Sequence, residues 1–200
     1  RVDYSGKNLK RLTFGDYTHQ VSVSPDGKYF ISTYSNVSTP TKVVLVDNKG
    51  KVIKELADSK SPDFDNYKIG KTSYFTIKSD DGKFDLPVII TYPVDFDETK
   101  EYPVIMSIYG GPDAGSVRNT WKNTSNSPYG GLSQHWANEG IIQIECDHRA
   151  SGHFGKQGVA WMHRNLGNWE LVDYITVAKW LKAKPWVKKD KLLITGHSYG

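Results

Sequence analysis

Short runs of alternating apolar and polar residues fill the first third of the chain. None of them has the 3.6-residue period of a helix, so each run predicts a β-strand. Segments 24–28 (Ser-Pro-Asp-Gly-Lys) and 47–50 (Asp-Asn-Lys-Gly) carry the residues that tight reversals require. The expected strands are 20–24, 29–35, 41–47 and 52–56. Four hairpin-connected strands are typical of one β-propeller blade, with any other antiparallel sheet as the alternative.

The pattern changes in the polar stretch 58–71, which contains Pro62 and predicts a connector between two domains, with the boundary at residues 68 and 69. Beyond it the expected strands are 74–77, 86–92, 104–109, 140–144 and 192–195, and the expected helix is 168–182. Segments 104–109 and 140–144 are nearly continuous apolar runs, expected to be buried on both faces, and 192–195 is expected to be another buried strand. The helix is expected to bury Leu171, Tyr174, Ile175, Ala178 and Leu181. Strand, helix and strand in this order predict a parallel βαβ unit and an α/β second domain.

Composition limits the classes of partner. The chain has 200 residues, 38% of them hydrophobic, and its net charge of +4 is scattered rather than clustered. Nucleic acid is therefore not expected as the main partner, and no apolar run in this segment is long enough to span a membrane. The single cysteine, Cys146, excludes an internal disulfide and is expected in the core. Arg1 stands directly before a turn and Gly200 stands where a helix should begin, so both ends are expected to be cut from a longer chain.

Residues 196–200, Gly-His-Ser-Tyr-Gly, fit the G-x-S-x-G pattern of a nucleophile elbow, the sharp strand-to-helix turn that exposes a serine in α/β-hydrolases. The pattern directly follows the apolar strand 192–195, which is the context that the motif requires. A strained backbone is expected at the serine, and side chains at Gly196 and Gly200 would clash with their neighbours. Ser198 is therefore the predicted nucleophile.

Acyl transfer also requires hydrogen-bond donors directed at the oxyanion of the tetrahedral intermediate. In such an elbow, one donor is the backbone N–H of the residue after the serine, here Tyr199. The other comes from the loop after an earlier strand, and residues 109–112, Tyr-Gly-Gly-Pro, end such a strand. The Tyr109 hydroxyl is the candidate donor, and the alternative is a tyrosine packed before an ordinary Gly-Pro turn.

A serine nucleophile needs a histidine base oriented by a carboxylate. In this fold the chain order is Ser, then Asp or Glu, then His, so both partners are expected beyond residue 200, and the 200 residues alone are not expected to hydrolyse a substrate. His197 adjoins the serine and is expected to point elsewhere. The earlier histidines are expected at the surface or in supporting positions: His135, His148, His153 and His163. No zinc-type spacing, dinucleotide motif or Walker motif occurs, so no metal site and no cofactor are predicted.

Segments 102–104 (Tyr-Pro-Val), 109–112, 147–152 (Asp-His-Arg-Ala-Ser-Gly) and 196–200 together resemble the prolyl oligopeptidase family of serine peptidases. The resemblance covers essentially the whole chain. The dipeptidyl peptidase IV branch is the most similar, since it shares the 147–152 loop, the elbow and a Leu-Gly pair before an acidic helix. His148 and Ala150 stand where that loop usually has glycine, so the backbone of segment 147–152 is expected to differ from that of the family's loop.

The resemblance implies that residues 1–68 are the C-terminal blade region of a β-propeller and residues 69–200 an incomplete α/β-hydrolase catalytic domain, up to the elbow. It also implies an oxyanion hole formed by Tyr109 and the Tyr199 N–H, with Arg149 as a structural or substrate-binding residue. The expected partner is a peptide substrate, and a homodimer is compatible with the family. The sequence itself gives no compartment, although a bacterial member of this branch would be periplasmic or secreted.

The predicted activity is cleavage of short peptides, with release of N-terminal dipeptides after Pro or Ala through an acyl-enzyme on Ser198. The glutamate pair that recognises the substrate's amino terminus in this branch lies in an earlier propeller segment, so dipeptide release rests on the resemblance. Two alternatives remain open. One is an acylaminoacyl peptidase or esterase on the same fold, and the other is a catalytically inactive binding protein that uses the propeller.

Overall fold

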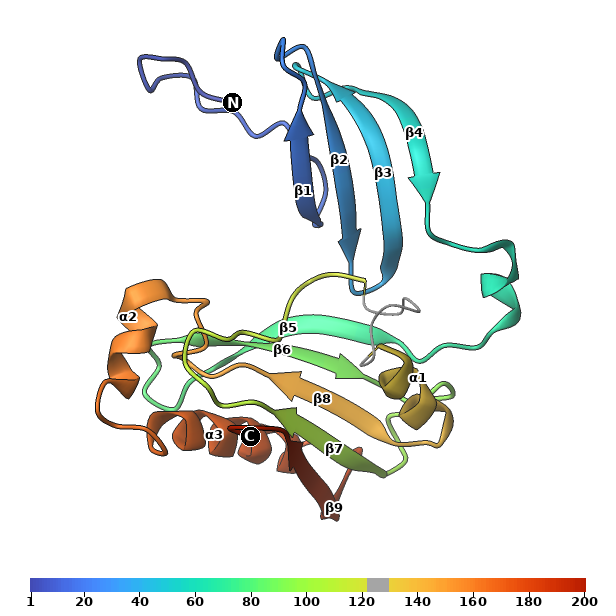
Figure 1. Cartoon of the computed structure of the whole chain (residues 1–200). Coiled ribbons are helices and arrows are strands. Elements are labelled where there is room, and N and C mark those ends of the chain that lie inside the picture. The colour runs from blue at the N-terminus through green and yellow to red at the C-terminus, as the bar shows by residue number, and fades with distance from the viewer. Residues whose placement is uncertain (122–129) are drawn as a thin grey trace. The chain divides into compact units, whose positions relative to one another are not determined.

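The computed structural model describes residues 1–121 and 130–200, which divide into two compact units (Figure 1). Unit 1 comprises Arg1–Tyr67 and a short segment that begins at Asn119. Unit 2 comprises Lys68–Arg118 and the chain from residue 130 onward. Each unit has its own hydrophobic cluster.

Unit 1 is a four-stranded antiparallel sheet in the order β1-β2-β3-β4. Its core is small and consists of Phe30, Val44 and Val46 from the two central strands. The strands are β1 (Thr18–Val23), β2 (Tyr29–Asn36), β3 (Thr39–Asp47) and β4 (Val52–Asp58), followed by the short 3-10 helix η1 (Pro62–Asn66). All four expected strands are present, and the order confirms that they form a hairpin-connected meander.

Unit 2 is built on a five-stranded sheet in the order β5-β6-β8-β7-β9 (Figure 1). The strands are β5 (Thr72–Lys78), β6 (Asp85–Thr91), β7 (Tyr102–Ile108), β8 (Ile142–Cys146) and β9 (Val187–Gly196). The helices are α1 (Gly130–Asn138), α2 (Gly155–Val159), the 3-10 helix η2 (Ala160–Met162) and α3 (Trp169–Lys182). β5 and β6 form an antiparallel hairpin, β6 pairs antiparallel with β8, and β7 pairs in parallel with both β8 and β9. The predicted parallel βαβ unit is therefore confirmed.

The register of β7, β8 and β9 brings three loops to one edge of the sheet. Ile108 pairs with Gly196, and Ser107 pairs with Glu145, so the three strands end side by side. Because parallel strands run in one direction, the loops that follow Ile108, Cys146 and Gly196 all leave from their carboxyl ends. In open α/β sheets, ligands bind at this edge.

The burial of two elements differs from the sequence prediction. In α3 the predicted apolar residues Leu171 and Ile175 are exposed, and the inward positions are Glu170, Asp173, Tyr174, Val177 and Leu181. Asp173 lies inside because the buried Arg149 bonds to it, and Glu170 accepts hydrogen bonds from the Tyr199 hydroxyl and the Gly167 N–H. Hydrophobic periodicity detects neither pairing. In β9, Leu193 and Ile194 are also exposed, although this strand is expected from the sequence to be buried, and β9 lies at one edge of the sheet within the described residues. Cys146 is buried, as predicted, and burial raises the pKa of its thiol.

A short segment that follows β7 in sequence packs within unit 1. The Asn119 carbonyl accepts a hydrogen bond from the Thr18 hydroxyl (2.7 Å), and the Asn119 side-chain oxygen accepts one from the Val37 N–H (3.1 Å). The Trp121 N–H donates to the Ser35 hydroxyl at 3.1 Å. The predicted boundary at residues 68 and 69 assigned this segment to the second domain, whereas its contacts are with the β1–β3 region of the first.

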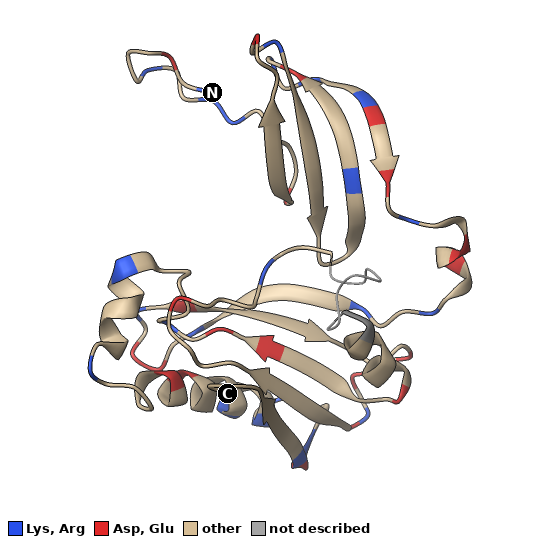
Figure 2. Ribbon diagram, viewed as in Figure 1, with Lys and Arg blue, Asp and Glu red and all other residues tan. Residues whose placement is uncertain are grey.

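Lysines and arginines are distributed over strands, loops and helices of both units (Figure 2). No helix within the described ranges is long and apolar enough to cross a bilayer. Within the same residues, no group of three or more His, Cys, Asp or Glu side chains could hold a metal ion.

Candidate active site

Ser198 occupies a strained turn at the end of β9. Its φ is +61°, in the left-handed region that non-glycine residues rarely adopt. The flanking positions require glycine because other backbone atoms lie close to them. A Cβ on Gly196 would lie 2.4 Å from the carbonyl carbon of Gly200, and a Cβ on Gly200 would lie 2.5 Å from the carbonyl oxygen of Ile108. The structure thus confirms the predicted elbow geometry and the predicted clashes at both glycines.

Tyr109 follows β7 directly, and its ring folds back over Gly111. A Cβ on Gly111 would lie 2.4 Å from Cε1 of that ring, so only glycine leaves the ring in place. The intervening Gly110 has a φ of +82°, which turns the loop back on itself. Tyr109 is exposed at the carboxyl edge of the sheet.

The Tyr109 loop and the elbow pack against each other through Tyr199. A Cβ on Gly110 would lie 3.0 Å from Cδ1 of the Tyr199 ring, so this ring rests on the loop that carries Tyr109. The Tyr199 hydroxyl donates a hydrogen bond to Oε1 of Glu170 at the start of α3 (2.9 Å). Partial burial and this bond raise the pKa of the Tyr199 hydroxyl.

A third loop, after β8, supports the Tyr109 loop from below. The Ala150 N–H donates to Nδ1 of the buried His148 (3.2 Å), so the proton of a neutral imidazole is on Nε2, which donates to the Gly111 carbonyl (3.2 Å). Burial lowers the pKa of His148 and keeps the imidazole neutral. The Asp113 N–H adds a second bond between these loops, to the Ala150 carbonyl at 2.9 Å. Ala150 is not among the residues with positive φ, so the loop accepts a side chain there.

Asp147, at the start of this loop, is a buried carboxylate that organises the chain beyond the Tyr109 loop. It accepts hydrogen bonds from the backbone N–H groups of Ser116 (3.1 Å) and Val117 (2.8 Å). His153 also donates to it through Nε2, at 2.8 Å. These bonds fix the path of the chain after Asp113.

Arg149 is fully buried, and its guanidinium already has its partners. It forms a bidentate pair with Asp173 on α3 (2.9 and 2.7 Å) and a third bond to Asp81 in the β5–β6 turn (2.9 Å). Three aromatic rings surround the guanidinium carbon at 4.4–5.1 Å, namely Phe84, Trp161 and Trp169. A group so enclosed has no surface to offer a substrate. The geometry therefore favours a structural role for Arg149 over a substrate-binding one.

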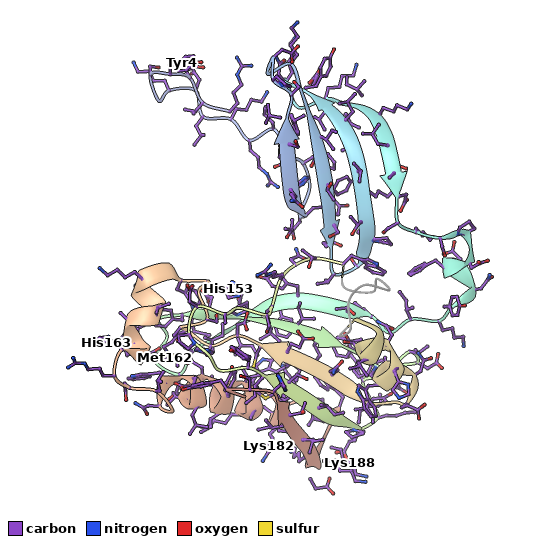
Figure 3. The ribbon with its side chains drawn as sticks, in the orientation of Figure 1. Tyr4, His153, Met162, His163, Lys182 and Lys188 are labelled. Atoms are coloured by element: carbon purple, nitrogen blue, oxygen red, sulfur yellow. The ribbon has the colours of Figure 1, made fainter. Side chains whose placement is uncertain are left out.

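The histidines of unit 2 are either exposed or hydrogen-bonded to groups other than Ser198. His135, His163 and His197 are exposed, His148 bonds to the Tyr109 loop, and His153 bonds to Asp147. His153 and His163 are labelled in Figure 3, near α2. Among the described residues, no hydrogen bond joins a histidine to Ser198. Neither the bond between Tyr199 and Glu170 nor the bond between His148 and Gly111 is indicated by the sequence. The Leu-Gly pair before an acidic helix is the one sequence signal near Glu170.

Comparison with known proteins agrees with this geometry. Residues 130–200 match the Prolyl oligopeptidase family. A solved structure described as a "putative dipeptidyl aminopeptidase IV" from Bacteroides ovatus is 32% identical, covers 91% of this chain and has a TM-score of 0.79. The chain belongs to the prolyl oligopeptidase family. Porphyromonas gingivalis dipeptidyl peptidase 4 superposes over 99% of the chain with a TM-score of 0.83 and 27% identity.

Relatives known from sequence extend the same family assignment. A Trichophyton verrucosum protein named "Probable dipeptidyl-aminopeptidase B" is 30% identical over 207 aligned residues and covers all of this chain. The chain spans 22% of that relative's length, and it spans 25% and 27% of the two solved chains. The similarity therefore concerns about a quarter of the length of each of these relatives.

Proposed function

We propose that this chain carries the nucleophile half of a serine peptidase active site, in which Ser198 attacks the substrate carbonyl. The observation that carries the proposal is the strained backbone of Ser198, held between two glycines that tolerate no side chain, directly after a parallel strand. A serine in this position presents its hydroxyl at the carboxyl edge of the sheet, as the elbow of α/β-hydrolases does.

In this proposal the Tyr199 N–H and the Tyr109 hydroxyl stabilise the oxyanion. Their loops pack on each other through the Tyr199 ring and Gly110, which supports a shared site. Donors fixed before the reaction need no reorganisation as negative charge develops, and one such donor contributes about 10²–10³-fold in kcat. The base and its carboxylate are proposed to lie beyond residue 200, since the described histidines have other partners or lie exposed.

We further assign residues 1–68 to the end of a β-propeller and residues 69–200, apart from the segment at Asn119 that packs within unit 1, to the first half of an α/β-hydrolase domain. The antiparallel meander of unit 1 and the mixed sheet of unit 2 support this division. For the whole protein we propose release of N-terminal dipeptides after Pro or Ala. The similar proteins are named as dipeptidyl peptidases or aminopeptidases, which favours this specificity over acylaminoacyl peptidase or esterase activity.

The test is fluorophosphonate labelling of the full-length protein beside the Ser198→Ala variant, followed by turnover of free and amino-blocked glycyl-prolyl chromogenic substrates. Label on the wild type alone, with cleavage of only the free substrate, is the expected result. Cleavage of the blocked substrate would favour the acylaminoacyl alternative. A wild-type protein that takes no label would overturn the hydrolase proposal and favour a propeller-based binding protein.

A further inference from the structure

Glu170 is a buried carboxylate next to the elbow. The residue is 4% exposed and lies in the first turn of α3. Its Oε1 accepts two hydrogen bonds, one from the Tyr199 hydroxyl (2.9 Å) and one from the Gly167 N–H (2.5 Å). A single oxygen atom thus joins the residue after the nucleophile to the turn that precedes α3.

The other carboxylate oxygen makes this arrangement unusual. Oε2 of Glu170 is buried and has no hydrogen-bond partner among the described residues. Burying an unpartnered carboxylate oxygen costs free energy, so the stability of unit 2 alone does not explain an acid at this position. What the carboxylate provides here is the pair of bonds at Oε1.

Tyr199 is the residue that these bonds restrain. Its ring packs on Gly110. The bond to Glu170 fixes the far end of the side chain. Because the backbone of Tyr199 continues directly from Ser198, a fixed side chain also limits rotation of the peptide between the two residues.

We propose that Glu170 is a positioning residue for acyl transfer, which holds Tyr199 and thereby the orientation of the elbow beside Ser198. This inference rests on the proposed function. Glu170 is hydrogen-bonded to the Tyr199 hydroxyl and the Gly167 N–H, and of these two groups only Tyr199 belongs to the elbow, so its effect on the elbow passes through Tyr199. Misplacement of reacting groups by about 1 Å costs on the order of 10²-fold in rate, so loss of this restraint should appear in kcat.

The experiment compares four variants of the full-length protein by steady-state kinetics and fluorophosphonate labelling rate. Glu170→Ala and Tyr199→Phe each remove the bond, and both should lower kcat by about 10–100-fold with little change in KM. Glu170→Gln keeps an acceptor oxygen and should recover most of that loss. Leu171→Ala is the matched control, because Leu171 adjoins Glu170 on the same helix but is 55% exposed.

The combined variant Glu170→Ala/Tyr199→Phe tests whether Glu170 acts through the phenol. If it does, the double variant is no slower than either single one, because each substitution removes the same bond. The inference would be overturned if Glu170→Ala kept the wild-type kcat, or if the loss of kcat in the double variant equalled the product of the two single losses. Should Glu170→Ala fail to fold, Tyr199→Phe alone carries the test, since it leaves the buried carboxylate in place.

Amide hydrogen exchange at the elbow separates this inference from the proposed function. If wild-type protein takes no label, the proposed function fails, and exchange of residues 197–200 decides the positioning role. Faster exchange there in Tyr199→Phe than in wild type, with the same melting temperature, supports the role. Equal exchange overturns it.

Discussion

Nε2 of His148 donates a hydrogen bond to the Gly111 carbonyl at 3.2 Å, so a buried imidazole on one loop holds the glycine pair of the next. The Tyr109 ring in turn covers Gly111. His148 thus supports the loop that presents the proposed oxyanion donor.

The first prediction concerns the pH dependence of stability. Burial lowers the pKa of His148 from its ordinary value of 6.5. As the pH falls below about 6.5, the unfolded chain binds a proton that the folded protein excludes, so the free energy of unfolding decreases until the lowered pKa is reached. The decrease from this one group is at most about 1.4 kcal/mol per pH unit.

The His148→Gln variant keeps an N–H for Gly111 and does not titrate. Urea unfolding of wild type and variant between about pH 5 and about pH 7.5 should therefore show a steeper loss of stability for the wild type on the acid side. Parallel pH profiles for the two proteins would show that His148 is not the group responsible.

The second prediction uses Gly111 to displace Tyr109. Position 111 lacks a positive φ, and the nearest obstacle to Gly111→Ala among the described residues is the Tyr109 ring, 2.4 Å from the added Cβ. The ring must move, and we expect kcat to fall by about 10²-fold, as for Tyr109→Phe. If both changes act on one donor, Tyr109→Phe should add little in the Gly111→Ala background. A full second loss in the double variant would argue that Tyr109 is not the affected group.

The third prediction concerns Arg149 as a structural centre. Arg149→Met leaves the buried Asp173 carboxylate without its cation, and loss of one partner of a buried pair costs about 3–5 kcal/mol. The control is Lys78→Met, because the Lys78–Asp85 pair is exposed on both sides and should change stability by less than about 1 kcal/mol. Chemical denaturation measures both. A small effect at Arg149 would mean that the buried pair with Asp173 is not a structural centre of unit 2.

The fourth prediction follows from the backbone of Ser198. Ser198→Gly and Ser198→Ala should both abolish fluorophosphonate labelling, but only glycine relieves the side-chain strain at a φ of +61°. We expect Ser198→Gly to be more stable than Ser198→Ala by about 0.5–1 kcal/mol, after allowing for the greater freedom of glycine in the unfolded chain. Thermal unfolding of the two inactive variants checks this. Equal melting temperatures would mean that the elbow stores no strain at the serine.

The chain's local patterns predicted its strands and the elbow because both depend on neighbours in sequence. The alternation of apolar and polar residues predicts β1–β4 correctly, and Gly196 and Gly200 allow the close backbone contacts that the motif implies. The helices α1 and α2 could not be predicted in this way, because their local sequences carry no helical signal. α1 begins with two glycines and α2 is a single turn with Gly at both its first and fourth positions, so neither shows a helical period or strong helix propensity.

The supporting contacts could not be predicted from sequence because their partners are distant along the chain. Arg149 bonds to residues 24 and 68 positions away, and nothing in the local sequence indicates which acids they are. Asp173 and Glu170 look like solvent-facing charges of an amphipathic helix until those partners are known. For the same reason, the apolar pattern of the helix places Leu171 on the buried face, although it is exposed.

The placement of Asn119 has a practical consequence for dividing the protein into fragments. The chain passes from unit 1 to unit 2 after Tyr67, returns at Asn119 and is again part of unit 2 at α1. A truncation at residue 68 would therefore deprive Thr18, Val37 and Ser35 of their bonded partners and leave Trp121 on a fragment without its acceptor. Because unit 1 is made of two separate stretches of chain, no single cut in the gene separates the two units. A fragment made by the cut at residue 68 would lack part of unit 1.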